Sequence, residues 1–385
     1  MKQDSLCMLV SLMMVLMFMV FPCAAQDEPP GNNLKAGGVK SLEKRIKHLE
    51  EAVRRTPESD KWYDRIQISG VVEVEAAHSS TDFKDPAADV TSASDIDLAT
   101  VELVFDAKIA AHVNGHVMFK YETDTDVFVD EGFITLAGTE AFPAYLIAGR
   151  QYIPFGNFDS HFVTDPLTLD LGETNEGAAV AGYRFGGDKY DLSVGAFNGK
   201  TGKVNSDSTT SNYVASFAAT PLESFMLGMS YTSNLAASGG LNEQAQDLDG
   251  NGETDDLNSY VGGWSAFASI SIMKFKLIGE YVGATDEFEA GELYDAADLN
   301  KRKPSAWNVE LGYAINDAWE AAGRYEASSD GDAGGAEFLP ESRYGGVVSW
   351  VFFENTNLAL EYLRSEYKND FQTDDVFTVQ LAVEF

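Results

Sequence analysis

The chain has 385 residues, of which 44% are hydrophobic and 12% aromatic, and its formal net charge is -34. Nucleic acid is excluded as a partner, because phosphates demand clustered Lys and Arg. A disordered chain is excluded as well, because the hydrophobic and aromatic residues are spread evenly along the sequence. Almost no segment has helical periodicity, so the length indicates one large β-architecture.

The first residues have the features of a secretory signal peptide. An apolar run at residues 6–21 follows Lys2, and the segment C-A-A at residues 23–25 offers the small residues that a signal peptidase reads. The run is shorter than the ~20 residues of a bilayer span, which argues against a membrane anchor. The bulky residues before Cys23 argue against a lipoprotein. We predict a signal peptide at residues 1–25 and a mature chain without cysteine.

Residues 26–60 are expected to form a periplasmic linker that ends in a short helix. The apolar positions of this helix are spaced 3, 4, 3 and 4 residues apart, at Val39, Leu42, Ile46, Leu49 and Val53. This spacing gives a coiled-coil seam, although two heptads are too few to be stable alone in water. Two interpretations stay open: an amphipathic helix packed on the main domain, or a coiled coil that joins subunits, as in a homotrimer.

From Arg65 onward the hydrophobic period changes to two. Apolar Ile66 and Ile68 alternate with polar Gln67 and Ser69, as in a sheet whose two faces meet different solvents. Turn and breaker residues delimit sixteen candidate strands, which start near residues 65, 95, 115, 127, 143, 176, 189, 211, 224, 259, 274, 304, 318, 342, 356 and 374.

The rhythm of the connections separates a membrane barrel from a soluble sandwich, which would show the same alternation. Short turns alternate with mostly long connections, so the short and long ends of the strands face opposite ways. An even strand number with this asymmetry is typical of transmembrane barrels. We therefore predict an all-β fold, a transmembrane antiparallel β-barrel at residues 61–385.

The last strand is the most specific single signal. Apolar residues from Phe377 to Phe385 alternate with polar ones, and the chain stops on the aromatic. A free apolar edge strand would promote aggregation, whereas barrel closure removes the edge. We expect Phe385 to be the insertion signal for the barrel assembly machinery, and the barrel to lie in outer-membrane lipid and lipopolysaccharide.

Three segments resemble one family of pores. They are D-E-G-F-I at residues 130–134, G-R-Q-Y-I-P-F-G-N-F at 149–158 and D-P-L-T-L-D-L-G-E-T at 165–174. With the helical seam and the terminal aromatic, they resemble LbtU-type siderophore porins, and residues 150–156 are more distantly similar to phosphate-selective porins. The first resemblance implies a sixteen-stranded pore with a periplasmic coiled coil, associated with uptake of iron carriers. No ligand-binding residue is carried over from it.

The third long connection, residues 153–175, is the candidate constriction. It holds Asp159, Asp165, Asp170 and Glu173 with no Lys or Arg, so a loop folded into a water-filled barrel would place a negative ring there. An outward-facing loop with solvated acids is the alternative. A basic ladder on the lumen wall is the opposing possibility, built from Lys120, Arg150, Arg184, Lys274, Lys276, Arg324 and Arg343.

A second acidic segment, D-L-D-G-N-G-E-T-D-D at residues 247–256, has the spacing of a calcium loop. Its candidate ligands are Asp247, Asp249, Asn251, Glu253 and Asp255 around a turn glycine, because alternate oxygens converge only when the backbone curls tightly. Position 12 is Asn258 instead of a bidentate Glu, so weak binding is expected. A solvated surface loop is the alternative.

No nucleophile arrangement is recognisable, so we do not expect an enzyme. Ser160 and His161 are adjacent, but neighbours on a strand point to opposite faces. The sequence predicts a porin in the bacterial outer membrane that needs no cofactor and passes small hydrophilic solutes, among them iron–siderophore complexes. A general or anion-selective porin is the alternative within transport, and a barrel adhesin or outer-membrane enzyme is the alternative from another class.

Overall fold

The computed structural model describes residues 62–83, 90–204, 210, 212–248, 256–333, 336–368 and 372–385. The predicted signal peptide and coiled-coil segment therefore lie outside the described residues. No helix within the described part of the chain is long and apolar enough to cross a membrane.

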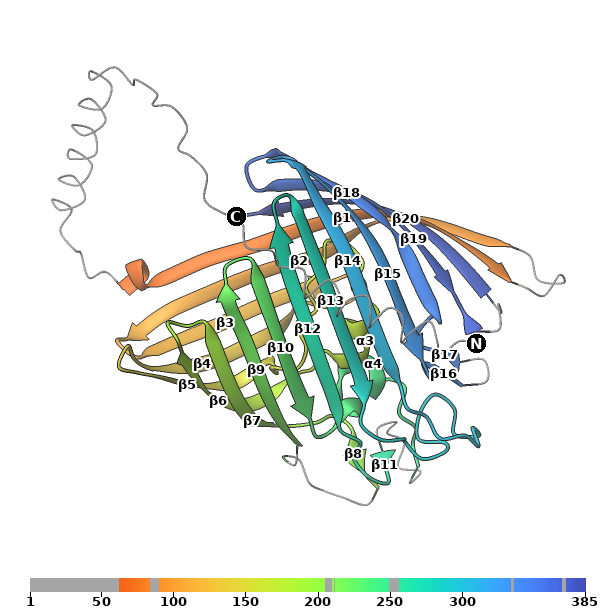
Figure 1. Cartoon of the computed structure of the whole chain (residues 1–385), viewed down its shortest axis with the longest axis horizontal. Helices are drawn as coiled ribbons and strands as arrows, with labels where there is room; N and C mark the ends of the chain where they lie inside the picture. Colours follow the sequence, from red (N-terminus) through yellow and green to blue (C-terminus); the bar gives the residue numbers. More distant parts are fainter. Residues whose placement is uncertain are drawn as a thin grey trace, which may run out of the picture. The chain divides into compact units, whose positions relative to one another are not determined.

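Sixteen antiparallel strands close into a barrel, in sequence order, with β1 paired to β20 (Figure 1). The strands are β1 (Ile66–Phe83), β2 (Thr91–Ala110), β3 (Val113–Glu122), β4 (Phe128–Thr139), β5 (Phe142–Tyr152), β6 (Asn175–Phe185), β7 (Tyr190–Phe197), β9 (Asn212–Leu222), β10 (Phe225–Thr232), β12 (Gly263–Ile272), β13 (Phe275–Ala284), β14 (Ser305–Asn316), β15 (Trp319–Ser329), β18 (Ser342–Phe353), β19 (Thr356–Glu366) and β20 (Gln372–Glu384). The predicted barrel is confirmed, and each predicted strand start lies within about four residues of an observed one.

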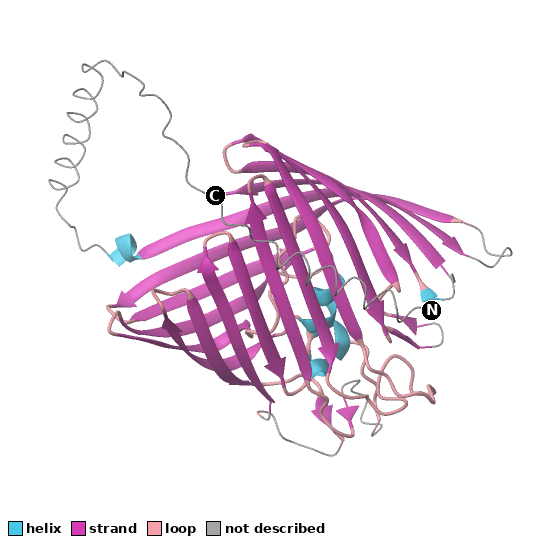
Figure 2. Ribbon diagram, viewed as in Figure 1, coloured by secondary structure: helices cyan, strands magenta, loops and turns pink. Residues whose placement is uncertain are grey.

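Smaller elements occupy the connections. They are η1 (Trp62–Arg65), α3 (Leu167–Gly172), η2 (Leu235–Ala237), α4 (Gly239–Asn242), β8 (Gly202–Lys203), β11 (Asp256–Leu257), β16 (Asp332–Ala333) and β17 (Ala336–Glu337). The parallel pair β8–β11 joins the connection after β7 to the one after β10. Helices α3 and α4 lie within the ring of strands (Figure 2).

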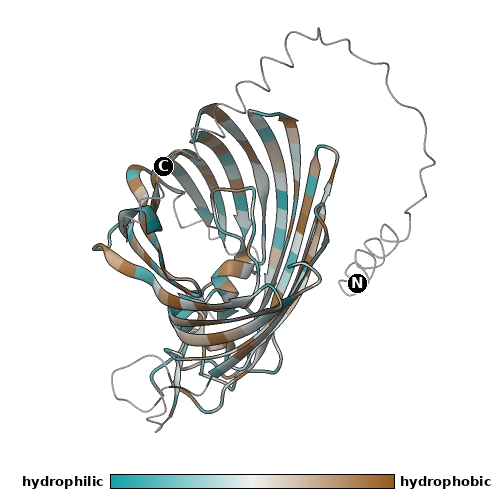
Figure 3. Ribbon diagram, turned by 90° about the vertical axis from the view of Figure 1, so that its left-hand side faces the viewer, coloured by the Kyte–Doolittle hydropathy of each residue, from teal (hydrophilic) through white to brown (hydrophobic). Residues whose placement is uncertain are grey.

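The barrel has an apolar exterior and a polar interior. Phe377, Leu381 and Val383 of β20 are exposed on the outside, whereas Thr378 between them is buried in the lumen. The same alternation of hydropathy runs along the other strands (Figure 3). A soluble sandwich would bury the apolar face, so this inversion identifies the outer surface as the face that meets lipid.

Aromatic pairs ring the exterior near both ends of the strands. Trp319–Trp350 and Phe275–Tyr313 lie toward the short turns, and Trp307–Tyr325 and Trp264–Tyr281 lie toward the long connections. Amphipathic aromatic rings favour the boundary between lipid and water. The two belts therefore mark the edges of the membrane-spanning band.

The C-terminal residue completes the closure. The backbone N–H of Phe385 donates to the Gly70 carbonyl oxygen, and the N–H of Gly70 donates to the Phe385 carbonyl oxygen, both at 3.0 Å. A side chain at position 70 would collide with the Phe385 ring, so the glycine makes room for it. The terminal aromatic therefore belongs to the barrel wall.

Candidate functional site

The third long connection, residues 153–174, folds into the barrel and is called the lumen loop here. Its backbone N–H groups donate hydrogen bonds of 2.6–2.9 Å to four glutamates of the lumen wall. The donor and acceptor pairs are Asn157 with Glu280 of β13, His161 with Glu310 of β14, Leu167 with Glu326 of β15, and Val163 with Glu361 of β19. Hydrogen bonds to charged acceptors are stronger than neutral ones, so the loop is held against this wall.

Two arginines neutralise part of this buried negative charge. Arg324, whose side chain is 0% exposed, pairs with Glu310 at 2.9 Å and donates to the Thr164 carbonyl oxygen at 2.8 Å. Arg343 pairs with Glu326 at 2.5 Å and donates to the Asp165 carbonyl oxygen. These two members of the predicted basic ladder are therefore engaged in holding the loop.

Other candidates for the basic ladder are also paired. Lys120 lies 2.8 Å from Glu122 and 3.8 Å from Glu102, and Arg184 lies 3.0 Å from Asp191. Arg150, which we proposed for the constriction, donates from Nε to the Asp130 carbonyl oxygen at 3.0 Å. Carboxylates offset the charges of Lys120 and Arg184, which weakens the case for a basic wall.

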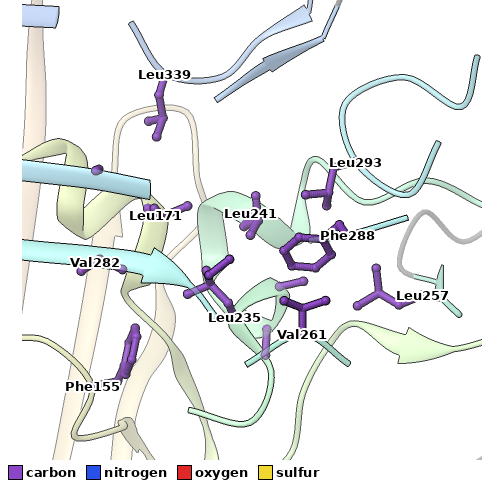
Figure 4. Close-up of a cluster of buried hydrophobic side chains, with 14 of the residues drawn as sticks. Phe155, Leu171, Leu235, Leu241, Leu257, Val261, Val282, Phe288, Leu293 and Leu339 are labelled. Carbon is purple, nitrogen blue, oxygen red and sulfur yellow. The ribbon is translucent and has the colours of Figure 1, made fainter. Parts of the chain in front are cut away.

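The far end of the lumen loop packs into an apolar cluster inside the barrel. Leu167 and Leu171 of α3 are fully buried, and other loops cover them. The labelled neighbours are Leu235, Leu241, Phe288, Leu293 and Leu339 (Figure 4). Gly239 also donates from its backbone to the Glu173 carbonyl oxygen at 2.9 Å. The connections after β10, β13 and β15 therefore press α3 into place.

The opposite side of the lumen loop borders a cavity of about 490 Å³. The barrel wall contributes Glu75, Ala99, Thr100, Glu122 and Thr123, and the other side contributes Val163, Thr164, Asp165, Asp170 and Arg343. Carboxylates line both sides of this space. The cavity is the candidate passage, since the loop is fixed against the other wall.

The structure brings together only part of the predicted constriction set. Asp165 and Asp170 line the cavity, and Glu173 lies close enough to both to interact electrostatically with them. Asp159 is exposed but does not line the cavity, and Arg150 lies at the base of the loop.

Three of the loop carboxylates have raised pKa values. Burial raises the pKa of Asp165, although Arg324 opposes the rise. Burial raises the pKa of Asp170 to about 6, although Arg343 opposes the rise. Burial, followed by repulsion from Asp165, raises the pKa of Glu173 to about 7. The negative charge beside the passage therefore grows as the pH rises through this range.

The predicted calcium loop lies largely outside the described residues, which include Asp247 but not residues 249–255. Asn258, its twelfth position, donates from its backbone and side-chain nitrogens to Glu292 Oε1 at 2.7 and 3.0 Å. Within the described part of the chain, no group of three or more His, Cys, Asp or Glu residues is arranged to hold a metal ion. Calcium binding stays a prediction.

The four loop-binding glutamates were not recognised from the sequence. Strand alternation placed Glu310 and Glu326 on the polar face of their strands, but it gave no partner for them. The available signal was the presence of these glutamates on the polar face of strands that the barrel brings together. Pairing with backbone amides of a distant loop appears only in the folded barrel.

No family model matches the chain. It is similar to a UPF0422 protein of Coxiella burnetii, with 27% identity over 273 residues, which cover 67% of this chain. UPF0422 proteins of Legionella pneumophila are 23% identical over 320 residues, which cover 77% of this chain. The matched part spans 57% and 58% of the length of these relatives.

Solved structures share the fold at low sequence identity. The chain is similar to the outer membrane channel DcaP of Acinetobacter baumannii, with TM-score 0.57 and 14% identity over 83% of this chain and 97% of that chain. OmpF of Salmonella typhi gives TM-score 0.58 and 16% identity, with the same coverage.

An anion-selective porin from Comamonas acidovorans gives TM-score 0.56 and 13% identity over 83% of this chain and 99% of that chain. A closed antiparallel barrel with a lipid-facing apolar surface has all its backbone groups paired within the sheet, as a membrane requires. The closed sixteen-stranded barrel, its apolar outer surface and its similarity in fold to solved porins together show that the chain is a β-barrel of the bacterial outer membrane.

Proposed function

We propose that the chain is a porin through which small hydrophilic solutes diffuse, with a preference for cations. The observation that carries this proposal is the cavity beside the lumen loop, which has Glu75 and Glu122 on one side and Asp165 and Asp170 on the other. Charged rings select permeating ions by sign, because field lines concentrate in a narrow passage with low-dielectric walls.

Reconstitution in a planar bilayer tests the proposal. The protein should give discrete ohmic current steps, and under a KCl gradient the reversal potential should have the sign of a cation-preferring pore. Absence of current from folded protein would remove the porin proposal and favour an adhesin or an enzyme. Current with anion preference would retain the porin but support the anion-selective alternative, and would make Lys120 and Arg343 the residues to mutate.

Iron–siderophore complexes are proposed as one solute class, supported by the sequence resemblance described above. The experiment is growth of a gene deletion strain on defined iron carriers under iron limitation. Loss of growth on one carrier, restored by the gene, would support this substrate. Normal growth of the deletion strain on every carrier tested would reject this substrate class and support a general porin instead.

Assembly in the membrane is proposed to use the terminal strand. Phe385 is hydrogen-bonded to Gly70 at the barrel seam, which supports a role in closure and in recognition by the barrel assembly machinery within a lipopolysaccharide membrane. Phe385→Ser should lower the outer-membrane amount several-fold without lowering export to the periplasm. Unchanged outer-membrane levels would contradict this role. Association into a homotrimer is a separate proposal, and size analysis in mild detergent tests it.

Calcium binding by the loop of Asp247, Asp249, Asn251, Glu253 and Asp255 is also proposed, at roughly the millimolar affinity of extracellular modules. Its support is the spacing of oxygen-bearing residues in the sequence. Isothermal titration should show weak binding that Asp247→Ala with Asp249→Ala removes. If the double variant binds calcium as strongly as the wild type, the loop is a solvated surface loop and not a calcium site.

A further inference from the structure

The lumen loop enters and leaves the barrel wall through a narrow neck. Tyr152 is the last residue of β5 and Asn175 is the first residue of β6, so these two residues flank the loop directly. Ile153 donates to the Thr174 carbonyl oxygen at 2.9 Å and extends the pairing of the two strands by one step. A side chain that binds both sides of this neck adds to the backbone pairing that fixes how the loop leaves the wall.

The side chain of Asp130, on β4, binds both sides. Its Oδ2 accepts a hydrogen bond from the Tyr152 hydroxyl at 3.0 Å, and its Oδ1 accepts one from Asn175 Nδ2 at 3.0 Å. Its backbone carbonyl accepts from Asn175 Nδ2 at 3.1 Å and from Arg150 Nε at 3.0 Å. Asp130 is only 5% exposed, so these bonds replace the water that its carboxylate loses.

A β-bulge gives Asp130 this position. In the pairing of β3 with β4, Met118 lies opposite Glu131 and Phe119 lies opposite Val129, so Asp130 is the extra residue. Val129 is 46% exposed on the outer surface, whereas Asp130 reaches the neck of the loop. Bulges of this kind redirect a side chain and are common beside functional sites.

The neck lies next in sequence to the part of the loop that borders the cavity. The last hydrogen bond from the loop backbone to a wall glutamate is made by Leu167, which donates to Glu326, and Asn175, directly after the loop, is bound by Asp130. The segment between them carries Asp170 and Glu173, which lie at or beside the cavity. The apolar cluster and the Gly239 hydrogen bond also hold this segment, so loss of the Asp130 bonds should loosen it at its second end rather than free it.

We propose that Asp130 is a positioning residue that clamps the neck of the lumen loop and thereby sets the aperture and selectivity of the passage. The inference rests on the proposed porin function for its transport consequence. Its structural part, the contribution of the Asp130 carboxylate to holding the neck of the loop, does not depend on transport. Arg150 belongs to this clamp through the Asp130 carbonyl oxygen.

Single-channel recording tests the transport consequence with Asp130→Ala. We expect several conductance levels in place of one, and a cation-to-anion permeability ratio at least two-fold lower. Asp191→Ala is the matched control, because Asp191 also accepts from a tyrosine hydroxyl, that of Tyr145, and pairs with Arg184 on the lumen wall. The control should keep the wild-type conductance and ratio. Wild-type recordings from folded Asp130→Ala protein would overturn the proposal.

A spin label tests loop immobilisation without any transport. The label is attached to Asp170→Cys, which lies beside the cavity in the segment between Leu167 and Asn175, and its motion is read from the electron paramagnetic resonance line shape. Asp130→Ala should sharpen the spectrum, whereas Asp191→Ala should not. An unchanged spectrum in Asp130→Ala would contradict the clamp even if the currents change. A sharpened spectrum in a protein that passes no current would support the clamp and reject the porin function.

A milder variant covers the case in which Asp130→Ala does not fold. Tyr152→Phe removes one hydroxyl and therefore one of the two clamping bonds to the carboxylate. It should show a smaller change of the same kind in both measurements. Identity of Tyr152→Phe with the wild type in both measurements would then count against the clamp.

Discussion

The two sides of the lumen loop use carboxylates in opposite ways. On the wall of β13 to β15 and β19, Glu310, Glu326 and Glu361 are at most 1% exposed and accept hydrogen bonds from loop backbone or arginine. On the other side, Asp165 and Asp170 border an open cavity together with Glu75. The first set fixes the loop, and the second set faces the permeating solute.

This difference shows why the net charge of a pore-forming chain is a poor guide to the charge of its pore. A buried carboxylate is retained only when hydrogen bonds or cations offset the loss of its hydration. Such a group contributes little to the field that a solute meets. The groups that decide ion preference are those beside the passage, where the protein supplies fewer partners.

The largest effect is expected on the fixed side, from Arg324→Met. Removal of Arg324 leaves Glu310 without its cation in a fully buried place, whereas Glu326 keeps Arg343. Breaking a buried pair costs about 3–5 kcal/mol. Unfolding of the refolded barrel in guanidinium should show this decrease. Arg184→Met, which breaks the partly exposed pair with Asp191, should cost about 0–1 kcal/mol. Similar losses of unfolding free energy in both variants would show that the buried pair is no more important for stability than the partly exposed one.

The second effect is on selectivity and should separate the two sides directly. Asp165→Asn, Asp170→Asn and Glu173→Gln together should lower the cation-to-anion permeability ratio at least two-fold at 0.1 M KCl, because they remove charge beside the cavity. Reversal potentials measure this ratio. Asp191→Asn, which neutralises a lumen carboxylate of β7 outside the set that lines the cavity, should change it little. An unchanged ratio in the triple variant would place selection elsewhere in the pore.

A third expectation concerns pH. The pKa values of Asp170 and Glu173 are raised to about 6 and about 7, so both groups gain negative charge between pH 5 and pH 8. Cation preference should rise over this interval, as measured by reversal potentials at constant salt. The variant Asp170→Asn with Glu173→Gln should lose most of this rise. A wild-type preference that falls as pH increases would contradict the assignment.

The same shifts have a consequence for stability. A carboxyl group whose pKa is higher in the folded state holds its proton more tightly there, so it favours folding most at low pH. This contribution is lost as pH rises from about 4, the ordinary value of these groups, through about 7. The denaturant midpoint of the wild type should fall over that interval more than that of the double variant.

The smallest effect is expected from salt. Raising KCl from 0.1 M to 1 M shortens the screening length from about 10 Å to about 3 Å, so the cation preference set by the carboxylates beside the cavity should weaken. The cost of Arg324→Met should change much less, because its partners are shielded from solvent. Equal salt sensitivity of selectivity and of this stability loss would show that the two sides do not differ in solvent access.

The sequence determined the barrel because its signals are local. Alternation along a strand such as Trp307 to Tyr313 assigns each residue to the lipid or to the lumen face, and short turns fix which strands are neighbours. The terminal strand ending in Phe385 was recognised for the same reason. Glu310 and Glu326 were thus assigned to the polar face from neighbouring residues alone.

Only the tertiary structure decided which acids serve the loop and which serve the passage. Glu361 and Val163, which are hydrogen-bonded, lie far apart in the sequence, and no local pattern encodes such a contact. Asp130 reaches the loop neck because a bulge interrupts the alternation from which faces are inferred. A strand pattern reports the face of each residue, whereas the partner across the lumen depends on closure of the whole barrel.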